Sequence, residues 1–246
     1  MSYRPEDPRV FFGQHHQDYA VSPRHARGAD LARLIAGLRP KAPMKAADIA
    51  AGAGHTALKL AELGLDVQAV DITPEMLRQT MEEANRRGLK LSLVEAPAES
   101  LPISDQSLDI VTCRRAAHHF SNVLAFLQES FRTLKPGGRL GISDMTASLG
   151  GADWLNHLER LRDPSHHQAL APDQWYQSLI ESGFSDIALE LSEEPMSLYE
   201  WLSPVDPDSP SGQEALAFAQ TAEAPLEFIR QGQLIKRRIV IWARRP

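Results

Sequence analysis

The chain has 246 residues, of which 43% are hydrophobic and 24% charged, and its formal net charge is −6. This length suits one domain with embellishments and allows a substantial core. The acidic balance argues against a general nucleic-acid or anionic-membrane surface. No run reaches the roughly 18 apolar residues of a membrane span, and residues 1–8 lack the apolar stretch of a secretory signal. The single cysteine, Cys113, excludes an internal disulfide and a multi-cysteine metal site, so the cytoplasm is the default compartment.

The N-terminal part of the chain predicts one helix. Residues 1–12 contain several charges and two prolines, and we expect a loose lead-in there. A helix is predicted over about residues 29–38, because four leucine and isoleucine side chains fall on one face at helical spacing.

Residues 45–71 form the unit around which the rest of the chain is arranged. Its first part is a short apolar run that stops at a Gly-Ala-Gly turn, residues 52–54, which is typical of a buried strand entering a tight turn. Apolar positions at helical spacing follow until Gly64, and a second strand then ends in Asp71. The predicted order is therefore strand, glycine turn, helix, strand and acid.

Each part of this unit suits a nucleotide-like ligand at the carboxyl ends of parallel strands, where backbone N–H groups and a helix N-terminus face outward. Gly52 and Gly54 let the backbone approach the ligand, and Asp71, about 20 residues further on, can accept both hydroxyls of a ribose. A dinucleotide and S-adenosylmethionine both fit this turn, and an ordinary strand-to-helix corner is the simpler alternative. Asp48 lies inside the first strand, where a buried carboxylate needs a partner. The cationic amine of an amino-acid-bearing ligand would supply one.

The remainder of the chain alternates further helices and strands. Thr73, Pro74 and Glu75 form a helix start of the usual kind. An insertion after the fifth strand, residues 146–172, is expected to lie over the carboxyl ends of the sheet. We predict further strands at about 89–95, 108–113, 139–144, 184–191 and 237–243, and helices at about 74–87, 122–134, 154–161, 172–182 and 212–231.

Four motifs follow one another between Ala46 and Met145. Besides the central unit they are the segment at residues 97–99, the strand at 108–113 and the Lys-Pro-Gly-Gly turn at 135–138. In this window the chain resembles the class I S-adenosylmethionine-dependent methyltransferases, especially the group related to the ubiquinone and menaquinone C-methyltransferases. The resemblance implies an α/β fold with a doubly wound, mostly parallel seven-stranded sheet, its last strand antiparallel between the fifth and sixth, and a helical lid. It also implies S-adenosyl-L-methionine as the cofactor.

The same resemblance implies which residues hold the cofactor. Ile72 would flank the adenine, Arg114 would contact the methionine part, and an N-terminal segment would fold over the cofactor. Pro97 stands where the family has an acid for the adenine edge, which leaves Ala98 and Glu99 for that contact. The implied cofactor-binding residues are Asp48, Ala50, Gly52, Gly54, Asp71, Ile72, Ala98, Glu99, Arg114, Tyr19 and His25. For the N-terminal pair in this list, the alternative is packing on the sheet and in a surface helix.

Acceptor chemistry is expected just beyond the strand at residues 108–113. Methyl transfer mainly requires alignment and exclusion of water, because the electrophile arrives activated with the cofactor. Where the acceptor must lose a proton, a histidine is the obvious base, so we predict His118 as catalytic and His119 and Trp154 as substrate-binding. Packed or solvated histidines are the alternative. No metal is predicted, because adjacent histidines rarely point at one ion.

The whole chain, 1–246, is predicted as a single methyltransferase domain. Its parts are an N-terminal helical cover (1–40), a cofactor-binding core (41–145), a lid insertion (146–172) and the C-terminal part of the sheet (173–246). The predicted function is methyl transfer to an O, C or N nucleophile of a small molecule, without nucleic acid. A nicotinamide-dependent reductase is disfavoured, because no Tyr-x-x-x-Lys pair occurs. A non-catalytic cofactor-binding relative stays open, and so does a homodimer.

Overall fold

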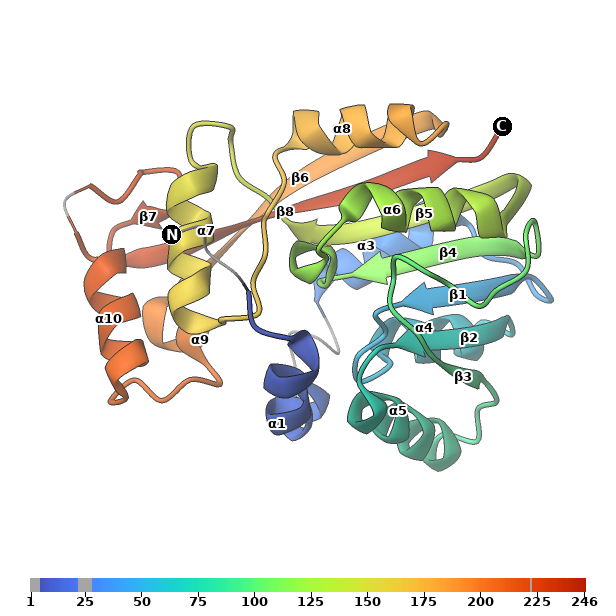
Figure 1. Ribbon diagram of the computed structural model, residues 1–246, viewed down its shortest axis with the longest axis horizontal. Helices are drawn as coiled ribbons and strands as arrows, with labels where there is room; N and C mark the ends of the chain where they lie inside the picture. The colour runs from blue at the N-terminus through green and yellow to red at the C-terminus, as the bar shows by residue number, and fades with distance from the viewer. Residues whose placement is uncertain (1–4, 22–27, 222) are drawn as a thin grey trace.

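One mixed sheet forms the centre of the described chain, which comprises residues 5–21, 28–221 and 223–246 of this computed structural model, with side chains described except at 15–21. Its strands are β1 (Lys45–Ile49), β2 (Asp66–Asp71), β3 (Ser92–Glu95), β4 (Leu108–Arg114), β5 (Leu134–Met145), β6 (Ser185–Ser197), β7 (Ile229–Arg230) and β8 (Gln233–Arg244). They lie in the order β3-β2-β1-β4-β5-β8-β6, and β7 pairs with β8 outside this path (Figure 1).

Helices cover both faces of the sheet. They are α1 (Pro8–Val21), α3 (Ala29–Leu38), α4 (His55–Glu62), α5 (Pro74–Arg86), the 3₁₀ segment η1 (Ala117–His119), α6 (Val123–Thr133), α7 (Ala152–Arg162), α8 (Pro172–Glu181), α9 (Leu198–Leu202) and α10 (Pro210–Ala219). Side chains of α3 and α4 pack on one face, and those of α6 and α8 pack on the other.

The central strands are buried on both faces, and their residues alternate between two cores. Ala46 packs with α3 and α4, whereas Ala47 belongs to the core beneath α6 and α8. In β8, Val240 faces the first core and Ile239 and Ile241 face the second. Successive side chains of a strand point to opposite faces. A strand that is apolar at every position is therefore what a sheet covered on both sides requires.

The doubly wound sheet expected from the family resemblance is confirmed. β1 to β5 pair in parallel, and β8 lies antiparallel between β5 and β6. The sheet has one more strand than predicted, because Gln231 and Gly232 take left-handed φ angles of 51° and 74° and turn β7 back onto β8. The helix predicted over residues 212–231 is correspondingly shorter and ends at Ala219.

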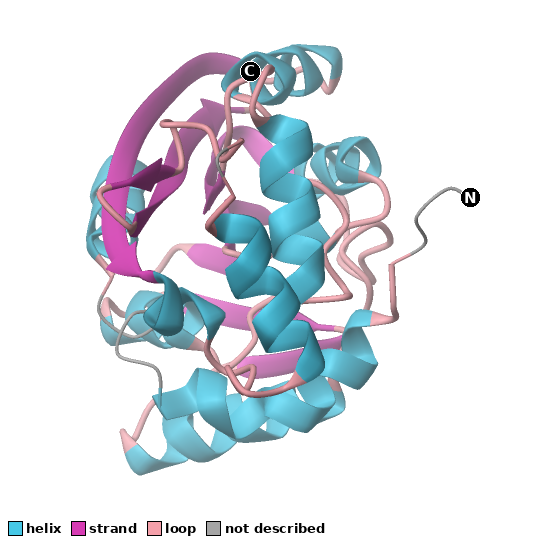
Figure 2. Cartoon of the chain, turned by 90° about the vertical axis from the view of Figure 1, so that its left-hand side faces the viewer, coloured by secondary structure: helices cyan, strands magenta, loops and turns pink. Residues whose placement is uncertain are grey.

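A smaller core covers one end of the sheet. There α7, α9, α10 and β7, which we call the helical cap, pack against the far ends of β6 and β8 (Figure 2). Leu158, Trp201 and Phe228 are buried in this core. The predicted insertion, residues 146–172, is therefore one part of a cap whose other members come from the C-terminal third. The sequence did not indicate this. The strand predicted over residues 184–191 ended too early, whereas β6 continues to Ser197 and leads the chain into the cap.

The N-terminal helix begins inside the predicted lead-in. α1 starts at Pro8 and packs against α5 (Figure 1). Proline suits the first position of a helix, since its φ is fixed and its missing N–H would have had no partner within the helix.

Within the described ranges, no helix is long and apolar enough to cross a membrane.

Candidate active site

A cavity of about 340 Å³ opens at the carboxyl ends of β1 to β4. Its walls come from the loops that follow these strands and from α1. This volume lies within the usual range for small-molecule sites. The strand order reverses beside β1, which pairs with both β2 and β4. Such a switch point is where open α/β sheets bind their ligands.

The loop between β1 and α4 forms one wall of the cavity. Ala50, Gly52 and Gly54 take left-handed φ angles of 52°, 53° and 80°. A Cβ on Gly52 would meet no atom within 4 Å, so the space beside this backbone is open to a ligand. A Cβ on Gly54 would lie 2.6 Å from Thr80 Cγ2, so this glycine lets α5 pack against the loop. Ala50 has a Cβ and therefore holds the loop under strain.

Asp71 ties together the loops after β1 and β2. Its Oδ2 accepts the Gly52 N–H at 2.7 Å, and its Oδ1 accepts the Thr73 N–H at 2.8 Å. Burial raises the pKa of this carboxyl, and the two N–H donors oppose the shift. Two carboxylate oxygens offer about four lone pairs. Asp71, which lines the cavity together with Ile72, therefore keeps acceptor capacity for the hydroxyls of a ribose.

Asp48 is a buried acid at the cavity wall. Its Oδ1 accepts the Thr112 hydroxyl at 2.7 Å, and its Oδ2 accepts the Ala57 N–H at 3.0 Å. Burial raises the pKa of Asp48 to about 7, although both hydrogen bonds favour the ionised form. A cation bound nearby would favour that form further. The site thus suits the ammonium group that the sequence led us to expect.

The loop after β3 supplies the wall expected beside the adenine. Pro97, Ala98 and Glu99 all line the cavity. Glu99 Oε1 accepts the backbone N–H of Ser121 at 3.1 Å and its hydroxyl at 3.0 Å, which fixes this carboxylate at the rim. The contacts of these residues with a cofactor stay predictions.

The N-terminal contribution to the cavity comes from residues that the sequence did not single out. Pro8 and Phe12 of α1 line the cavity, and the ring of Phe12 meets that of His119 edge-on at 5.0 Å between centroids. Tyr19 lies in α1, but its side chain falls outside the described part, as does the whole of His25. Their cofactor roles stay predictions.

Two consecutive arginines at the end of β4 share one carboxylate. Arg114 Nε and Nη2 donate to the two oxygens of Asp30, on α3, at 2.7 and 2.9 Å. Arg115 Nε and Nη2 donate to the same oxygens at 3.1 and 2.8 Å. Burial alone would raise the pKa of Asp30, but the guanidiniums hold it well below its usual range. Both arginines line the cavity, and the predicted contact of Arg114 with a methionine moiety stays a prediction.

His118 lies behind the cavity wall and is held by Asp144 at the end of β5. Asp144 Oδ1 is 2.5 Å from His118 Nδ1, and Oδ2 accepts the His118 backbone N–H at 3.0 Å. The two residues are only 7% and 1% exposed. Burial would raise the pKa of Asp144, but His118 and the Met145 N–H keep it below its usual value. Because an ionised carboxylate only accepts hydrogen bonds, the Nδ1–H of His118 donates to Asp144, and in the neutral imidazole Nε2 would be the acceptor.

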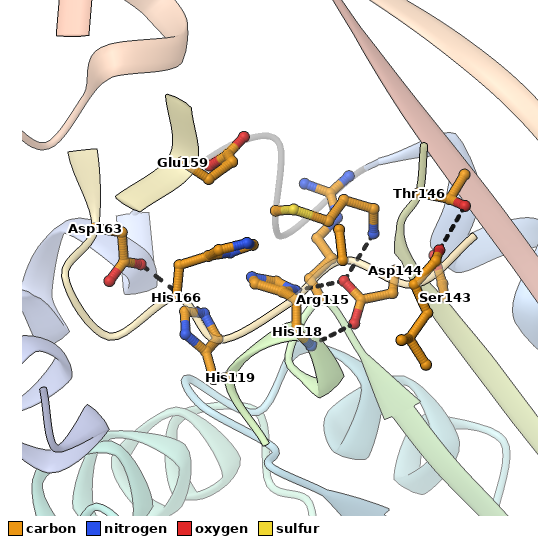
Figure 3. A network of polar contacts seen from close by, with 12 residues as sticks. Arg115, His118, His119, Ser143, Asp144, Thr146, Glu159, Asp163 and His166 are labelled. Carbon is orange, nitrogen blue, oxygen red and sulfur yellow. Dashed lines mark hydrogen bonds and ion pairs between the residues drawn. The ribbon is translucent and has the colours of Figure 1, made fainter. Parts of the chain in front are cut away.

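His119 lines the cavity and is backed by the loop after α7. Its Nδ1 lies 3.1 Å from Ser165 Oγ, and the Ser165 hydroxyl donates to Asp163 at 2.6 Å. Burial and the nearby His118 lower the pKa of His119 to about 4, so the ring is neutral near pH 7. The ring of His166 lies 5.5 Å from that of His118, and the three imidazoles form one cluster (Figure 3).

Trp154 packs inside the helical cap. Its ring stacks on those of Phe218 and Phe228, each at 5.4 Å between centroids. The described residues that line the cavity do not include it. The structure therefore lends no support to the predicted contact of Trp154 with the substrate.

Several partners of the site residues were not identified from the sequence. A signal existed for Asp144, an acid at the end of a predicted strand and at the same sheet edge as Asp71. No comparable signal marked Asp30, because acids are common in the first turn of any helix. The Asp163–Ser165 pair lies in a loop with no recognisable motif.

Comparisons with known proteins decide the family. A family model described as a methyltransferase domain matches residues 47–142. The uncharacterised methyltransferase YcgJ of Bacillus subtilis is 38% identical over 67% of this chain and 66% of its own length. The crystal structure of YcgJ covers 88% of this chain and 97% of that one at 29% identity, with a TM-score of 0.82. A Bacillus halodurans structure described as a methyltransferase is 30% identical over 89% of this chain and 100% of that one, with a TM-score of 0.81.

The chain belongs to the S-adenosylmethionine-dependent methyltransferases. The resemblance to the C-methyltransferase group is also confirmed, since the ubiquinone/menaquinone biosynthesis C-methyltransferase of Nitrobacter hamburgensis is 34% identical over 58% of this chain. This methyltransferase spans 60% of the length of that relative. Of the two enzyme classes that the sequence left open, methyl transfer is the one supported.

S-adenosylmethionine is the cofactor of this family, and the cavity of this methyltransferase fits it. The space beside Gly52 is open, Asp71 has acceptor capacity for a ribose, and Asp48 is a buried acid suited to an ammonium group. When bound, the cofactor supplies a methyl group already activated on a sulfonium. The residues of the chain must then position the acceptor, and where the acceptor has to lose a proton they must also accept it.

Proposed function

We propose that this methyltransferase methylates an oxygen or carbon atom of a small hydrophobic acceptor, and that His118 is the base that removes the proton of the acceptor. The observation that carries the proposal is the buried pair of His118 and Asp144 at the carboxyl ends of β4 and β5. Such a pair is costly to bury unless its members hold one another in a defined arrangement.

The order of the strands separates two sides of the cavity. Asp71 ends β2 and Glu99 lies on the loop after β3, on the side that we assign to the cofactor. His119 stands on the loop after β4, and Asp144 ends β5 on the other side of β1. An acceptor is therefore expected on the side of β4 and β5. Phe12 and Phe120 line the cavity there and offer it an apolar surface.

The hydrogen bonds of His118 suit a base. With the Nδ1 proton directed at Asp144, Nε2 has no hydrogen-bond partner among the described residues. The carboxylate of Asp144 stabilises the imidazolium that forms when Nε2 takes up a proton. His119, whose ring centroid lies 4.1 Å from that of His118, stays neutral near pH 7 and can contact the acceptor at the wall.

The test compares turnover with cofactor affinity in three variants. S-adenosylhomocysteine released in the presence of a panel of small phenols and enols measures turnover, and calorimetry measures the affinity for S-adenosylhomocysteine. We expect His118→Ala to lower turnover by about 10²- to 10⁴-fold. Affinity should change by less than about threefold. Asp144→Asn should lower turnover by a smaller factor, because it removes the carboxylate that holds His118 while the imidazole itself remains.

His157→Ala is the matched control, since His157 is an exposed histidine of α7 that packs on Phe218. It should leave both quantities unchanged. His118→Gln provides a second test in case the alanine variant does not fold. Equal losses of turnover and affinity would make His118 a structural or cofactor residue, and unchanged turnover would remove it from the reaction.

A further inference from the structure

Arg115 is held at the cavity wall in a strained conformation. Its φ of +58° is left-handed, which is uncommon for a residue with a Cβ. The backbone N–H donates to Ser143 O of β5 at 2.6 Å, and the side chain is 6% exposed. Strain of this kind persists where surrounding contacts impose it, and it concentrates at functional sites. Arg115 is also one of the residues that line the cavity.

The charge of this guanidinium is not fully balanced by its ion-pair partner. Asp30 brings a single negative charge to two guanidiniums, those of Arg114 and Arg115. Asp144, the acid on the neighbouring strand, is bonded to His118 and to the backbone N–H of Met145. Asp48 acts on Arg114 through its charge, and among the described acids Asp30 alone forms an ion pair with Arg115.

The donors of Arg115 point to the same conclusion. A guanidinium carries five N–H donors, and Asp30 receives those of Nε and one of Nη2. For the Nη1 donors and the second Nη2 donor, the described residues provide no hydrogen-bond partner. The edge formed by Nη1 and Nη2 is the one that binds a carboxylate through two parallel hydrogen bonds.

The position of Arg115 favours the acceptor side of the cavity. Figure 3 shows Arg115 beside His118 and Asp144, which belong to η1 and to the end of β5. The groups that fit the cofactor lie at the ends of β1 and β2 and on the loops after β1 and β3. An anion on Arg115 would thus stand next to the proposed base, beyond the ribose and adenine walls.

We propose that Arg115 binds the carboxylate of the methyl acceptor, so that the substrate of this enzyme is a small carboxylic acid with an apolar or aromatic body. The inference rests on the proposed function, because it assumes that methyl transfer takes place in this cavity. Phe12 and Phe120 would contact the apolar body while the Nη1–Nη2 edge of Arg115 fixes the acid group. The carboxylate would be an anchor and take no part in proton transfer.

The experiment measures binding of a matched pair of probes. The protein is first titrated with S-adenosylhomocysteine and then, in the saturated state, with 4-hydroxybenzoate or its neutral analogue 4-hydroxybenzamide. We expect the acid to bind about 10- to 100-fold more tightly than the amide, as for a charge-assisted hydrogen bond in a buried site. Arg115→Gln should remove this difference by lowering the affinity for the acid and not that for the amide. Arg115→Lys should restore part of the difference.

Arg245→Gln is the matched control. Arg245 is a half-buried arginine that donates to the backbone carbonyls of Phe131, Arg132 and Leu134 and does not belong to the described lining of the cavity. The variant should leave the preference for the acid intact. Melting curves of all three variants establish that they are folded.

Two further results would overturn the inference. Equal binding of acid and amide, or binding of neither, would exclude a carboxylate subsite at Arg115. The decarboxylated analogue of S-adenosylhomocysteine tests the other source of a carboxylate. If Arg115→Gln weakens S-adenosylhomocysteine but not this analogue, the partner of Arg115 is the cofactor itself. Absence of any binding of S-adenosylhomocysteine to the unaltered protein would instead refute the proposed function.

Discussion

At the scale of one residue, the buried carboxyl of Asp48 lowers the stability of the free protein and is expected to strengthen the binding of a cationic ligand. It is 2% exposed and accepts two hydrogen bonds, which do not replace the water that an ionised carboxylate loses on burial. Because its pKa is raised to about 7, the carboxyl of the free folded protein is largely protonated below neutral pH, even with the charge of Arg114 nearby. A ligand with an ammonium group would recover the lost stability, so we expect Asp48 to contribute to binding at the expense of the stability of the free protein.

We expect Asp48→Asn to stabilise the free protein at neutral and alkaline pH and to weaken cofactor binding. Between the ordinary pKa of 3.8 and the folded value of about 7, the folded protein keeps a proton that the unfolded chain loses. The free energy of unfolding of the unaltered protein therefore falls as the pH rises through this window. The decrease is at most about 4 kcal/mol, since one pKa unit corresponds to about 1.4 kcal/mol.

Thermal unfolding of both proteins from about pH 4 to pH 8 measures this effect. The stability of the variant relative to that of the unaltered protein should increase as the pH rises. The affinity of the unaltered protein for S-adenosylhomocysteine should rise over the same range. A stability difference that is independent of pH would contradict the assignment of the raised pKa to Asp48.

At the scale of elements, the loop between β1 and α4 combines binding and folding in two neighbouring glycines. Gly52 leaves open space beside the ligand, whereas Gly54 allows α5 to approach. Both have positive φ angles, so a side chain at either position is strained. The effects of the two substitutions should differ only in what the new methyl group meets.

We expect Gly52→Ala to cost about 1–2 kcal/mol of stability, the usual penalty for a left-handed residue with a Cβ. It should also lower the affinity for S-adenosylhomocysteine by more than about tenfold, because the methyl group occupies ligand space. Gly54→Ala should cost about 1–3 kcal/mol more in stability, since its Cβ would clash with Thr80. Denaturant unfolding and calorimetry measure the two quantities.

Gly88→Ala is the control that measures the cost of backbone strain alone. Gly88 has a φ of 66°, no atom within 4 Å of a Cβ position, and no place in the described lining of the cavity. It should lose stability like Gly52→Ala and bind the cofactor normally. Equal binding losses in the Gly52 and Gly88 variants would show that strain, and not the lost space, governs affinity.

At the scale of the whole molecule, the sheet was predictable and the helical cap was not. The strands carry apolar residues at consecutive positions, as at Ala46 and Ala47, and this local pattern follows from burial on both faces. The cap depends on contacts such as those of Trp201 with Glu159, which lie 42 residues apart. Such contacts leave no periodic signal in either segment.

The candidate site likewise contains residues that the sequence could predict and residues that it could not. Gly52 and Asp71 were predictable because a strand, a turn and a strand end place them at one edge within a single continuous motif. Asp30 and Arg115 meet across 85 residues, and neither is unusual in its own segment. The family resemblance predicted which residues hold the cofactor, while the ion pairs beside the proposed acceptor side became visible only in three dimensions.

A calorimetric titration of S-adenosylhomocysteine into the unaltered protein and into Asp71→Asn tests the assignment of this cavity most directly, and NADH is titrated for comparison. We expect one site per chain for S-adenosylhomocysteine and no heat with NADH. Asp71→Asn should bind S-adenosylhomocysteine at least about 100-fold more weakly, because two charge-assisted hydrogen bonds are lost, and should still melt cooperatively. Tight binding of NADH without binding of S-adenosylhomocysteine, or unchanged affinity in Asp71→Asn, would contradict the assignment of this cavity.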